Sequence, residues 1–304
     1  MKKILITGAT GAIGQNLVRR LLTAGNQVFI FTQNPEKAAK KLPEVKRIIK
    51  WDYDLKNEWK HELNGIDAVV HLAGENLSVK RWSEKFKKSA YESRILSTRK
   101  LVEAIKSIEQ KPNVFICASG VGIYGNRYDE ILDEKSLTGN DFLSKLCTDW
   151  ETEAKKVEEL GVRRVSIRTG LVLIKDDGVL KKLKRPFKLF IGGSLGNGRQ
   201  WFPWIHIDDV VGIYLKAIED KNLCDVFNAA SPGIVRTKEF AKTFGKILNR
   251  PSFLNIPKFA MKIAAGEVAD YAVMSQRISA DKILNSGYKF KFENLEEALR
   301  DLLK

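Results

Sequence analysis

The sequence has few cysteines and no long apolar run, and each shortage excludes a class of protein. Its cysteines, Cys117, Cys147 and Cys224, are odd in number and widely spaced, so they predict neither a disulfide framework nor a zinc knuckle. No apolar stretch approaches the roughly twenty residues that a membrane-spanning helix needs. The first residues lead into a predicted strand and not into a signal-peptide core. We therefore expect a soluble, cytoplasmic protein.

Patterns typical of metal proteins and nucleic-acid-binding proteins are also missing. The histidines His61, His71 and His206 have no ligand spacing, which predicts no metal site. The net charge of +15 includes basic runs at 80–88 and 181–185, which could attract nucleic acid or a membrane surface. Lysine exceeds arginine, and the basic residues are interleaved with acids, which favours solvated faces. We expect no nucleic-acid or membrane partner, and a field that favours a small anionic substrate. Nothing in the sequence fixes the oligomeric state.

A glycine fingerprint follows the apolar run at residues 4–6 and opens into the helix-like residues 15–22. The first glycine, Gly8, lets the chain turn out of the strand, and the second, Gly11, lets the backbone approach a pyrophosphate. The third, Gly14, lets the helix pack on the sheet with its amino-terminal amides facing the phosphates. This context predicts a bound dinucleotide cofactor. The predicted cofactor contacts in this loop are Gly8, Thr10, Gly11, Ala12 and Ile13.

Apolar runs alternate with helical periodicity, which is the pattern of a parallel sheet with crossover helices. We expect an α/β protein with a Rossmann-like doubly wound sheet over residues 1–165, to which the chain returns at about residues 205–230. A smaller lobe, mainly helical after residue 237, is expected to bind substrate over residues 166–304. The predicted strands are Lys3–Thr7, Gln27–Thr32, Arg47–Trp51, Ala68–Leu72, Val114–Ser119, Arg164–Thr169 and Val226–Ala230, and helices are expected to begin near Gly11, Trp82 and Asp141.

The end of the second strand indicates which dinucleotide binds. NAD enzymes place an acidic residue there to bind the adenosine ribose, whereas Thr32, Gln33 and Lys37 could receive a 2′-phosphate. Glu36 weakens this distinction, so NADP is favoured and NAD stays open. Further predicted cofactor contacts are Asp52 after the third strand and Leu72, Ala73 and Gly74 at the end of the fourth.

Several motifs resemble one known family along nearly the whole chain. Besides the fingerprint, these motifs are His71-Leu72-Ala73-Gly74-Glu75-Asn76-Leu77, Lys80-Arg81-Trp82, Ser93-Arg94, Val121-Gly122-Ile123-Tyr124-Gly125, Asp149-Trp150-Glu151, Gly192-Gly193, Gly198-Arg199-Gln200-Trp201, Trp204-Ile205-His206-Ile207-Asp208-Asp209 and Arg250-Pro251 through Gly266-Glu267. They resemble atypical, extended short-chain dehydrogenases/reductases, in the epimerase-family group of YfcH-like proteins within the NAD-dependent epimerase/dehydratase superfamily. The resemblance implies a Rossmann domain like that of nucleotide-sugar epimerases, with a small C-terminal lobe.

The wider superfamily implies a proton-transfer set of Ser, Asn and a Tyr-x-x-x-Lys motif, in which the lysine cation lowers the phenol pKa. Here Gly120 stands at the Ser position, with Ser119 one residue away. Asp141 stands at the Tyr position and Arg94 at the Asn position. Lys145 alone matches, and the resemblance implies that it holds the nicotinamide ribose.

Another residue must then move the proton, or catalysis has been lost. Tyr124 is the first candidate, because a phenol after the fifth strand lies at the sheet edge where ligands of such folds bind. A packed aromatic with a hydrogen-bonded hydroxyl is the alternative. Ser119 and Asp141 are weaker candidates, since an aspartate needs a raised pKa to donate a proton.

The substrate side combines cations with aromatic rings. An anionic, partly flat ligand suits such a combination. In the sugar-nucleotide enzymes that the chain resembles, an arginine stands four residues before the histidine of a His-x-x-Asp segment. Here that histidine is His206, and Phe202 stands at the arginine position. A nucleotide-diphosphate sugar is therefore not assured as the substrate. The predicted substrate-binding residues are Asn76, Arg81, Trp82, Tyr124, Arg199 and Trp201.

These observations leave two functions open. The first is an NADP-dependent oxidoreductase or epimerase acting on a carbonyl or hydroxyl of a small anionic substrate. The second is a non-catalytic NADP-bound redox sensor that regulates a protein partner, which the missing proton-transfer residues favour. The sequence fixes neither the substrate nor the direction of reaction.

Overall fold

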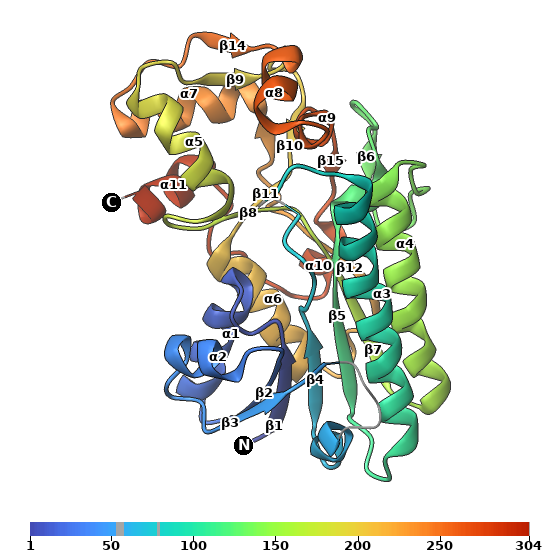
Figure 1. The fold of residues 1–304 in the computed structure, drawn as a ribbon. Coiled ribbons are helices and arrows are strands. Elements are labelled where there is room, and N and C mark those ends of the chain that lie inside the picture. Colours follow the sequence, from blue (N-terminus) through green and yellow to red (C-terminus); the bar gives the residue numbers. More distant parts are fainter. Residues whose placement is uncertain (53–57, 78–79, 304) are drawn as a thin grey trace.

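The computed structural model, which describes residues 1–52, 58–77 and 80–303, is organised around a seven-stranded parallel sheet (Figure 1). The strand order is β12-β7-β5-β4-β1-β2-β3. The strands are β1 (Lys3–Thr7), β2 (Gln27–Thr32), β3 (Arg47–Lys50), β4 (Ala68–His71), β5 (Val114–Gly120), β7 (Arg163–Thr169) and β12 (Asp225–Ala229). The expected α/β class and doubly wound sheet are confirmed, including the late return of the chain to the sheet through β12.

The strand predictions hold to within one residue at their ends. The first two strands match, β3 and β4 end one residue early, β5 ends one residue late, β7 begins one residue early, and β12 is shifted by one. At the end of β3, Trp51 N still donates to Thr32 O at 2.9 Å. The differences therefore concern single positions at the margins of the hydrogen-bonded ladder.

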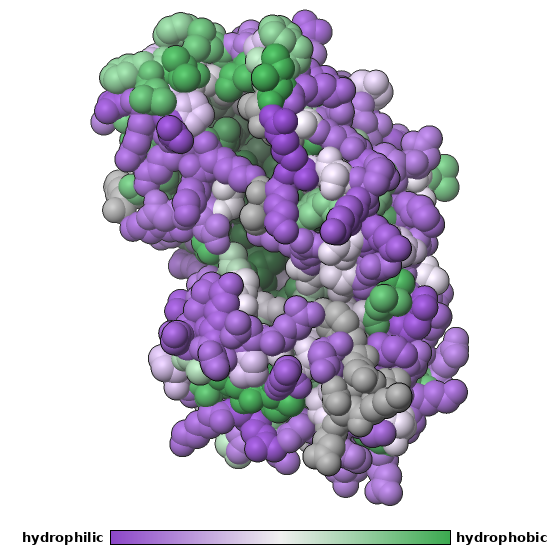
Figure 2. Space-filling model, viewed as in Figure 1, coloured by the Kyte–Doolittle hydropathy of each residue, from purple (hydrophilic) through white to green (hydrophobic). Residues whose placement is uncertain are grey.

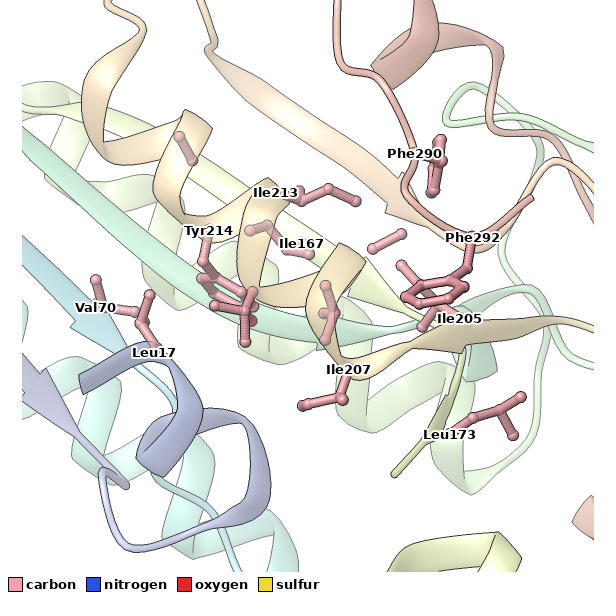
Figure 3. Packing of buried hydrophobic residues seen from close by; sticks show 14 of the residues in the cluster. Leu17, Val70, Ile167, Leu173, Ile205, Ile207, Ile213, Tyr214, Phe290 and Phe292 are labelled. Carbon is pink, nitrogen blue, oxygen red and sulfur yellow. The ribbon is translucent and has the colours of Figure 1, made fainter. Parts of the chain in front are cut away.

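Helices cover both faces of the sheet. In β1, Ile4 and Ile6 belong to one buried apolar cluster and Leu5 to another, as strand alternation requires. The first cluster joins α1 (Ala12–Thr23) and α6 (Ile207–Glu219) to the sheet, and Figure 3 shows part of it. The second cluster joins α3 (Glu84–Ser107) and α4 (Phe142–Lys155) to the opposite face.

A second lobe lies beyond the carboxyl ends of β1 and β4 (Figure 1). It contains three two-stranded pairings, and a fourth joins β6 to β15. Figure 2 shows a partly apolar recess between this lobe and the sheet domain. The pairs are β8 (Leu171–Leu173) with β11 (Trp204–His206), β9 (Gly193–Leu195) with β14 (Leu254–Ile256), β10 (Trp201–Phe202) with β13 (Val235–Arg236), and β6 (Ile131–Leu132) with β15 (Arg277–Ile278). The remaining helices are α2 (Pro35–Lys41), α5 (Gly178–Lys188), α7 (Thr237–Leu248), α8 (Lys258–Ala265), α9 (Val268–Ala272), α10 (Asp281–Asn285) and α11 (Leu295–Leu303), with 3-10 turns η1 (Glu58–Leu63), η2 (Val121–Tyr124) and η3 (Lys156–Leu160).

The expected domain boundary at residue 165 falls inside β7, and the division of the chain into two domains stays a prediction. β7 pairs with β5 and β12 through Thr169, because both neighbours continue to that level. We propose that the sheet domain extends to Thr169 and takes α6 and β12 back from the second half of the chain. Among the described residues, no helix is long and apolar enough to cross a membrane.

Candidate functional site

The fingerprint loop is shaped by close backbone contacts. Gly8 has a φ of +67°, which side-chain-bearing residues rarely adopt, and a Cβ there would lie 2.6 Å from Leu72 C. A Cβ on Gly14 would lie 2.5 Å from Gly8 O, so α1 packs directly on the loop. These two glycines are therefore required by packing.

Gly11 has a different environment. A Cβ on Gly11 would meet only Gly8 O, at 3.3 Å, and otherwise open space. Gly11 is also the N-cap of α1, with no side chain capping the helix and no acidic residue in its first turn. The amino-terminal amides of α1 thus stay available to an anion, as a cofactor pyrophosphate requires. The neighbouring residues Thr10, Ala12 and Ile13 are partly exposed around this opening.

The segment after β2 leads into α2, which contacts the fingerprint loop. Thr32 is partly exposed, Gln33 and Lys37 are exposed, and the Asn34 side chain caps α2 by accepting from Lys37 N at 2.8 Å. Lys41 Nζ reaches the fingerprint and donates to Thr10 O at 3.2 Å. Lys41 is not among the contacts predicted from the sequence, although its i, i+4 spacing from Lys37 places both cations on one helix face. Exposed Asp52 follows β3, but residues 53–57 lie outside the described residues.

The ends of β1 and β4 are joined through buried side chains. Thr7 Oγ1 lies 2.7 Å from His71 Nδ1 and accepts from Ala73 N at 3.1 Å. Burial, and then the charge of Arg94, lowers the pKa of His71 to about 3, so the ring is neutral. Leu72 and Ala73 are partly exposed, and a Cβ on Gly74 would collide with Arg94 Cζ at 2.8 Å. The β4 end therefore lies directly against the fingerprint.

Residues at the superfamily's proton-transfer positions have structural contacts here. Asp141 caps α4 by accepting from Ser144 N at 3.0 Å. Arg94 lies over the Trp150 ring at 5.1 Å and donates to Glu75 O at 3.0 Å. A Cβ on Gly120 would make only van der Waals contacts, the nearest with Cys147 Sγ at 3.7 Å. Packing therefore does not explain why serine is absent at this position.

Lys145 points away from the buried part of α4. Its side chain is 70% exposed and forms an ion pair with Asp149 at 2.8 Å. Tyr91 donates to the same carboxylate at 2.7 Å. The expected contact of Lys145 with a nicotinamide ribose remains a prediction, and it requires the ion pair to rearrange.

Tyr124 belongs to a buried hydrogen-bonded network. Its side chain is fully buried, its hydroxyl donates to Asn228 Oδ1 at 2.7 Å, and Arg168 Nη1 donates to it at 2.9 Å. Burial raises the pKa of Tyr124 to about 12, against the effect of Arg168. The network continues through Arg168 to Glu151 at 2.8 Å, and Ser119 donates to Glu151 at 2.6 Å. In this arrangement Asn228 and Arg168 enclose the hydroxyl, as in the alternative of a packed aromatic with a hydrogen-bonded hydroxyl, and the catalytic role of Tyr124 stays a prediction.

The C-terminal lobe meets the sheet domain at the amino-terminal ends of α3 and α4. Trp82 lies 4.7 Å from Tyr271 and 5.4 Å from Phe142, measured between ring centroids. Arg81 donates to Ile263 O, which fastens the segment before α3 to α8. Asn76 is exposed nearby in sequence, and residues 78–79 lie outside the described residues.

Tyr271 was missed by the sequence analysis. Burial, followed by the charges of Asp141 and Glu267, raises the pKa of Tyr271 to about 12. The backbone of Phe142, the residue after the position where the superfamily has its tyrosine, acts in the opposite direction and lowers the pKa of the Tyr271 hydroxyl. No sequence signal marks this residue, because it is more than a hundred positions from α4 in the chain.

Arg199 lines a cavity of about 860 Å³ in the C-terminal lobe, and Trp201 lies beside its lining residue Arg236. The cavity is lined by Arg199 and by Arg236 at the start of α7. Arg236 and Arg277 lie over the Trp201 ring at 4.2 Å and 4.9 Å, and the Trp201 indole donates to Asp129 at 2.8 Å. This arrangement combines a flat ring with several cations, as an anionic aromatic ligand requires.

Comparisons with known proteins agree with this geometry. The family model described as the NAD dependent epimerase/dehydratase family matches residues 4–230, and one described as a domain of unknown function (DUF1731) matches residues 256–302. Epimerase family protein SDR39U1 homolog, chloroplastic, from Arabidopsis thaliana is 37% identical over 308 residues, covering 99% of this chain and 86% of that protein. Epimerase family protein YfhF from Bacillus subtilis is 35% identical over 301 residues, covering 99% and 97%.

A solved structure is similar over its full length. The crystal structure of human epimerase family protein SDR39U1 (isoform 2) with NADPH has a TM-score of 0.88 and 32% sequence identity. The match covers 99% of this chain and 98% of the human chain.

Proposed function

The chain belongs to the NAD dependent epimerase/dehydratase family, and on that premise we propose that it binds NADPH and acts as an oxidoreductase or epimerase on a small anionic substrate. The family resemblance read from its motifs is confirmed. Bound NADPH would exchange a hydride with a carbonyl or hydroxyl carbon of the substrate. The residues of the chain position the two ligands and move the proton.

The cofactor proposal depends mainly on one observation. The amino terminus of α1 has no side-chain cap, and the space beside it at Gly11 is open except for Gly8 O. The pyrophosphate would lie there, on the amides of α1. Thr32, Gln33, Lys37 and Lys41 would surround the adenosine 2′-phosphate, since Lys41 reaches the fingerprint and exposed Lys37 lies one helical turn before it on α2. The human relative crystallised with NADPH supports the same choice.

Calorimetric titration tests this cofactor choice. NADPH should bind at least about tenfold more tightly than NADH, a difference of about 1.4 kcal/mol. The double variant Lys37→Ala/Lys41→Ala should reduce that ratio, because it removes the cations that face the 2′-phosphate. Lys46→Ala, which removes an exposed charge after α2, should leave the ratio unchanged. Equal affinities of the wild type for the two dinucleotides would contradict the proposal.

Gly11→Val separates cofactor binding from folding. The new Cβ would meet only Gly8 O, at 3.3 Å, which a small shift can relieve, so the protein should fold and lose NADPH affinity. Gly14→Ala is the contrasting variant and should unfold, because its Cβ would collide with Gly8 O. A folded Gly11→Val protein that binds NADPH like the wild type would show that the fingerprint does not hold the cofactor.

For the substrate, we propose an anionic, partly flat molecule that lies between Trp82 and the Arg199–Trp201 segment. Arg81, Arg199 and Asn76 would supply polar contacts, and the cavity near Arg199 has the size of ordinary small-molecule sites. For the proton we propose Tyr271, whose phenol stays protonated at neutral pH and lies beside Asp141 at the vacant tyrosine position. Ser119, Tyr124 and Lys145 are the alternatives that the sequence supplied.

The second candidate function is a non-catalytic NADP-bound sensor acting on a protein partner. The observation in its favour is the buried network around Tyr124, in which the phenol is closed to any substrate. On this alternative, NADPH would change the affinity for a partner and no chemistry would follow.

A further inference from the structure

Six large apolar side chains are exposed together on the outer side of the C-terminal lobe. Phe253, Phe259 and Ile263 are 77%, 69% and 73% exposed, and Phe190 is 57% exposed. Figure 2 shows the apolar surface along the top edge of the molecule, over α8 and the β9–β14 pair. We call this surface the outer patch, and it consists of Leu189, Phe190, Ile191, Phe253, Phe259 and Ile263.

The fold brings these residues together from two distant parts of the chain. Residues 189–191 follow α5 and lead into β9, whose Gly193 pairs with Leu254 of β14. Phe253 therefore lies beside the approach to β9. Helix α8 follows β14 after Pro257, and Phe259 and Ile263 lie four residues apart on one of its faces.

The two segments that build the outer patch carry charge of one sign. Residues 178–207 and 240–266 contain eleven lysines and arginines and no aspartate or glutamate. The expected interleaving of basic and acidic residues is therefore wrong for this part of the chain. Carboxylates from other segments pair with four of these lysines, since Asp176 meets Lys184, Glu296 meets Lys246, and Asp270 meets Lys258 and Lys262. A positive excess remains around the apolar residues.

An arginine side chain also contacts an aromatic ring of the outer patch. The guanidinium of Arg250 lies 4.7 Å from the centroid of the Phe190 ring. A surface that offers both groups at one point suits a partner with an anionic layer above an apolar one.

We propose that the outer patch binds the surface of a bilayer that contains anionic lipids. Its apolar side chains would enter the boundary between headgroups and acyl chains, while the surrounding lysines and arginines would neutralise lipid phosphates. Such binding is peripheral and agrees with the absence of a membrane-spanning helix among the described residues. It is independent of the proposed enzymatic function.

The charge of the outer patch argues against its pairing with a second copy. A two-fold dimer would place the same basic surface on both sides of the interface, and like charges there are destabilising. Protruding side chains suit a lipid surface, which needs no matching shape.

Vesicle co-sedimentation tests the proposal. The full chain should sediment with vesicles of phosphatidylcholine containing about a third phosphatidylglycerol, and stay in the supernatant with phosphatidylcholine alone. Raising the salt concentration should weaken binding, because it screens the lysine and arginine charges.

Two variants separate the apolar and the electrostatic contributions. Phe253→Ser/Phe259→Ser should reduce vesicle affinity about tenfold or more, since both rings leave the interface. Lys181→Glu/Lys188→Glu should reduce it by a similar factor through lost attraction to phosphate. The matched control Lys106→Glu/Leu137→Ser changes an exposed lysine and an exposed leucine elsewhere and should bind like the wild type. All variants should keep the wild-type melting temperature and NADPH affinity.

Several results would overturn the proposal. One is wild-type protein that stays in the supernatant with phosphatidylglycerol vesicles. Another is undiminished sedimentation of the folded Phe253→Ser/Phe259→Ser variant. A wild-type dimer that this variant converts to a monomer, measured by light scattering, would assign the outer patch to self-association. RNA binding without vesicle binding would assign the basic residues to nucleic acid.

Discussion

At the scale of single residues, the polar side chains near the end of β5 stabilise the fold through satisfied hydrogen bonds. Tyr124 exchanges hydrogen bonds with Asn228 and Arg168, and the Arg168 guanidinium is also held by Glu151. Removing one member of such a buried network leaves its partners without hydrogen bonds, which costs more than the bond itself contributes.

Replacing Tyr124 by phenylalanine should therefore lower the free energy of unfolding by about 1–3 kcal/mol, measured by urea denaturation. Asn228 Oδ1 loses its donor while the ring volume is kept. NADPH affinity should not change. Tyr128→Phe, which alters an exposed tyrosine, is the control and should leave stability unchanged. Unchanged stability of Tyr124→Phe together with a hundredfold loss of turnover would instead make Tyr124 the proton donor.

At the scale of elements, one histidine joins three of them beside the cofactor loop. His71 at the end of β4 contacts Thr7 of β1 at 2.7 Å and Ser97 of α3 at 3.2 Å. Because burial and Arg94 hold the pKa of His71 near 3, the folded protein keeps the ring neutral where an unfolded chain would protonate it.

This difference predicts the direction of a pH effect. Between the ordinary pKa of 6.5 and about 3, the unfolded state binds more protons at His71 than the folded state. Stability should therefore fall as the pH falls through this window, by up to about 1.4 kcal/mol per pH unit from this group. His71→Gln should have a shallower pH slope of the urea midpoint, whereas His61→Gln, at an exposed position, should keep the wild-type slope. Identical slopes for wild type and His71→Gln would show that His71 does not cause the effect.

At the scale of the whole molecule, the C-terminal lobe contacts the sheet domain at the amino-terminal end of α3. Lys87 of α3 forms an ion pair with Glu267 at 2.7 Å, next to the Trp82–Tyr271 contact. The lobe thus holds a phenol at the amino terminus of α4, on the side of the sheet where the cofactor loop opens.

A screen of carbonyl compounds with NADPH oxidation as the readout should give at least one substrate if the protein is an enzyme. For that substrate, Tyr271→Phe should reduce turnover by about a hundredfold and keep NADPH affinity, as expected for a positioned acid–base group. Leu137→Ala, at an exposed position outside the cavity lining, should keep both. A Tyr271→Phe variant with wild-type turnover would exclude Tyr271. A screen without substrates, combined with a protein partner whose affinity depends on NADPH, would favour the sensor.

The sequence by itself determined the sheet, the fingerprint and the family. Strand periodicity and glycine spacing are local properties, and the residues that express them, such as Gly8 and Gly14, are fixed by contacts within a few positions or with the adjacent strand. The prediction that NADP is preferred over NAD also came from a short segment after β2.

Only the tertiary structure decided the environment of residues whose roles depend on neighbours that are distant in the chain. The burial of Tyr124 comes from Asn228 and Arg168, and the position of Tyr271 comes from a lobe that folds back onto α4. The outer patch forms because β9 and β14 pair across sixty residues of chain. Such contacts leave no periodic signal, since their physical cause is the packing of elements that the sequence separates.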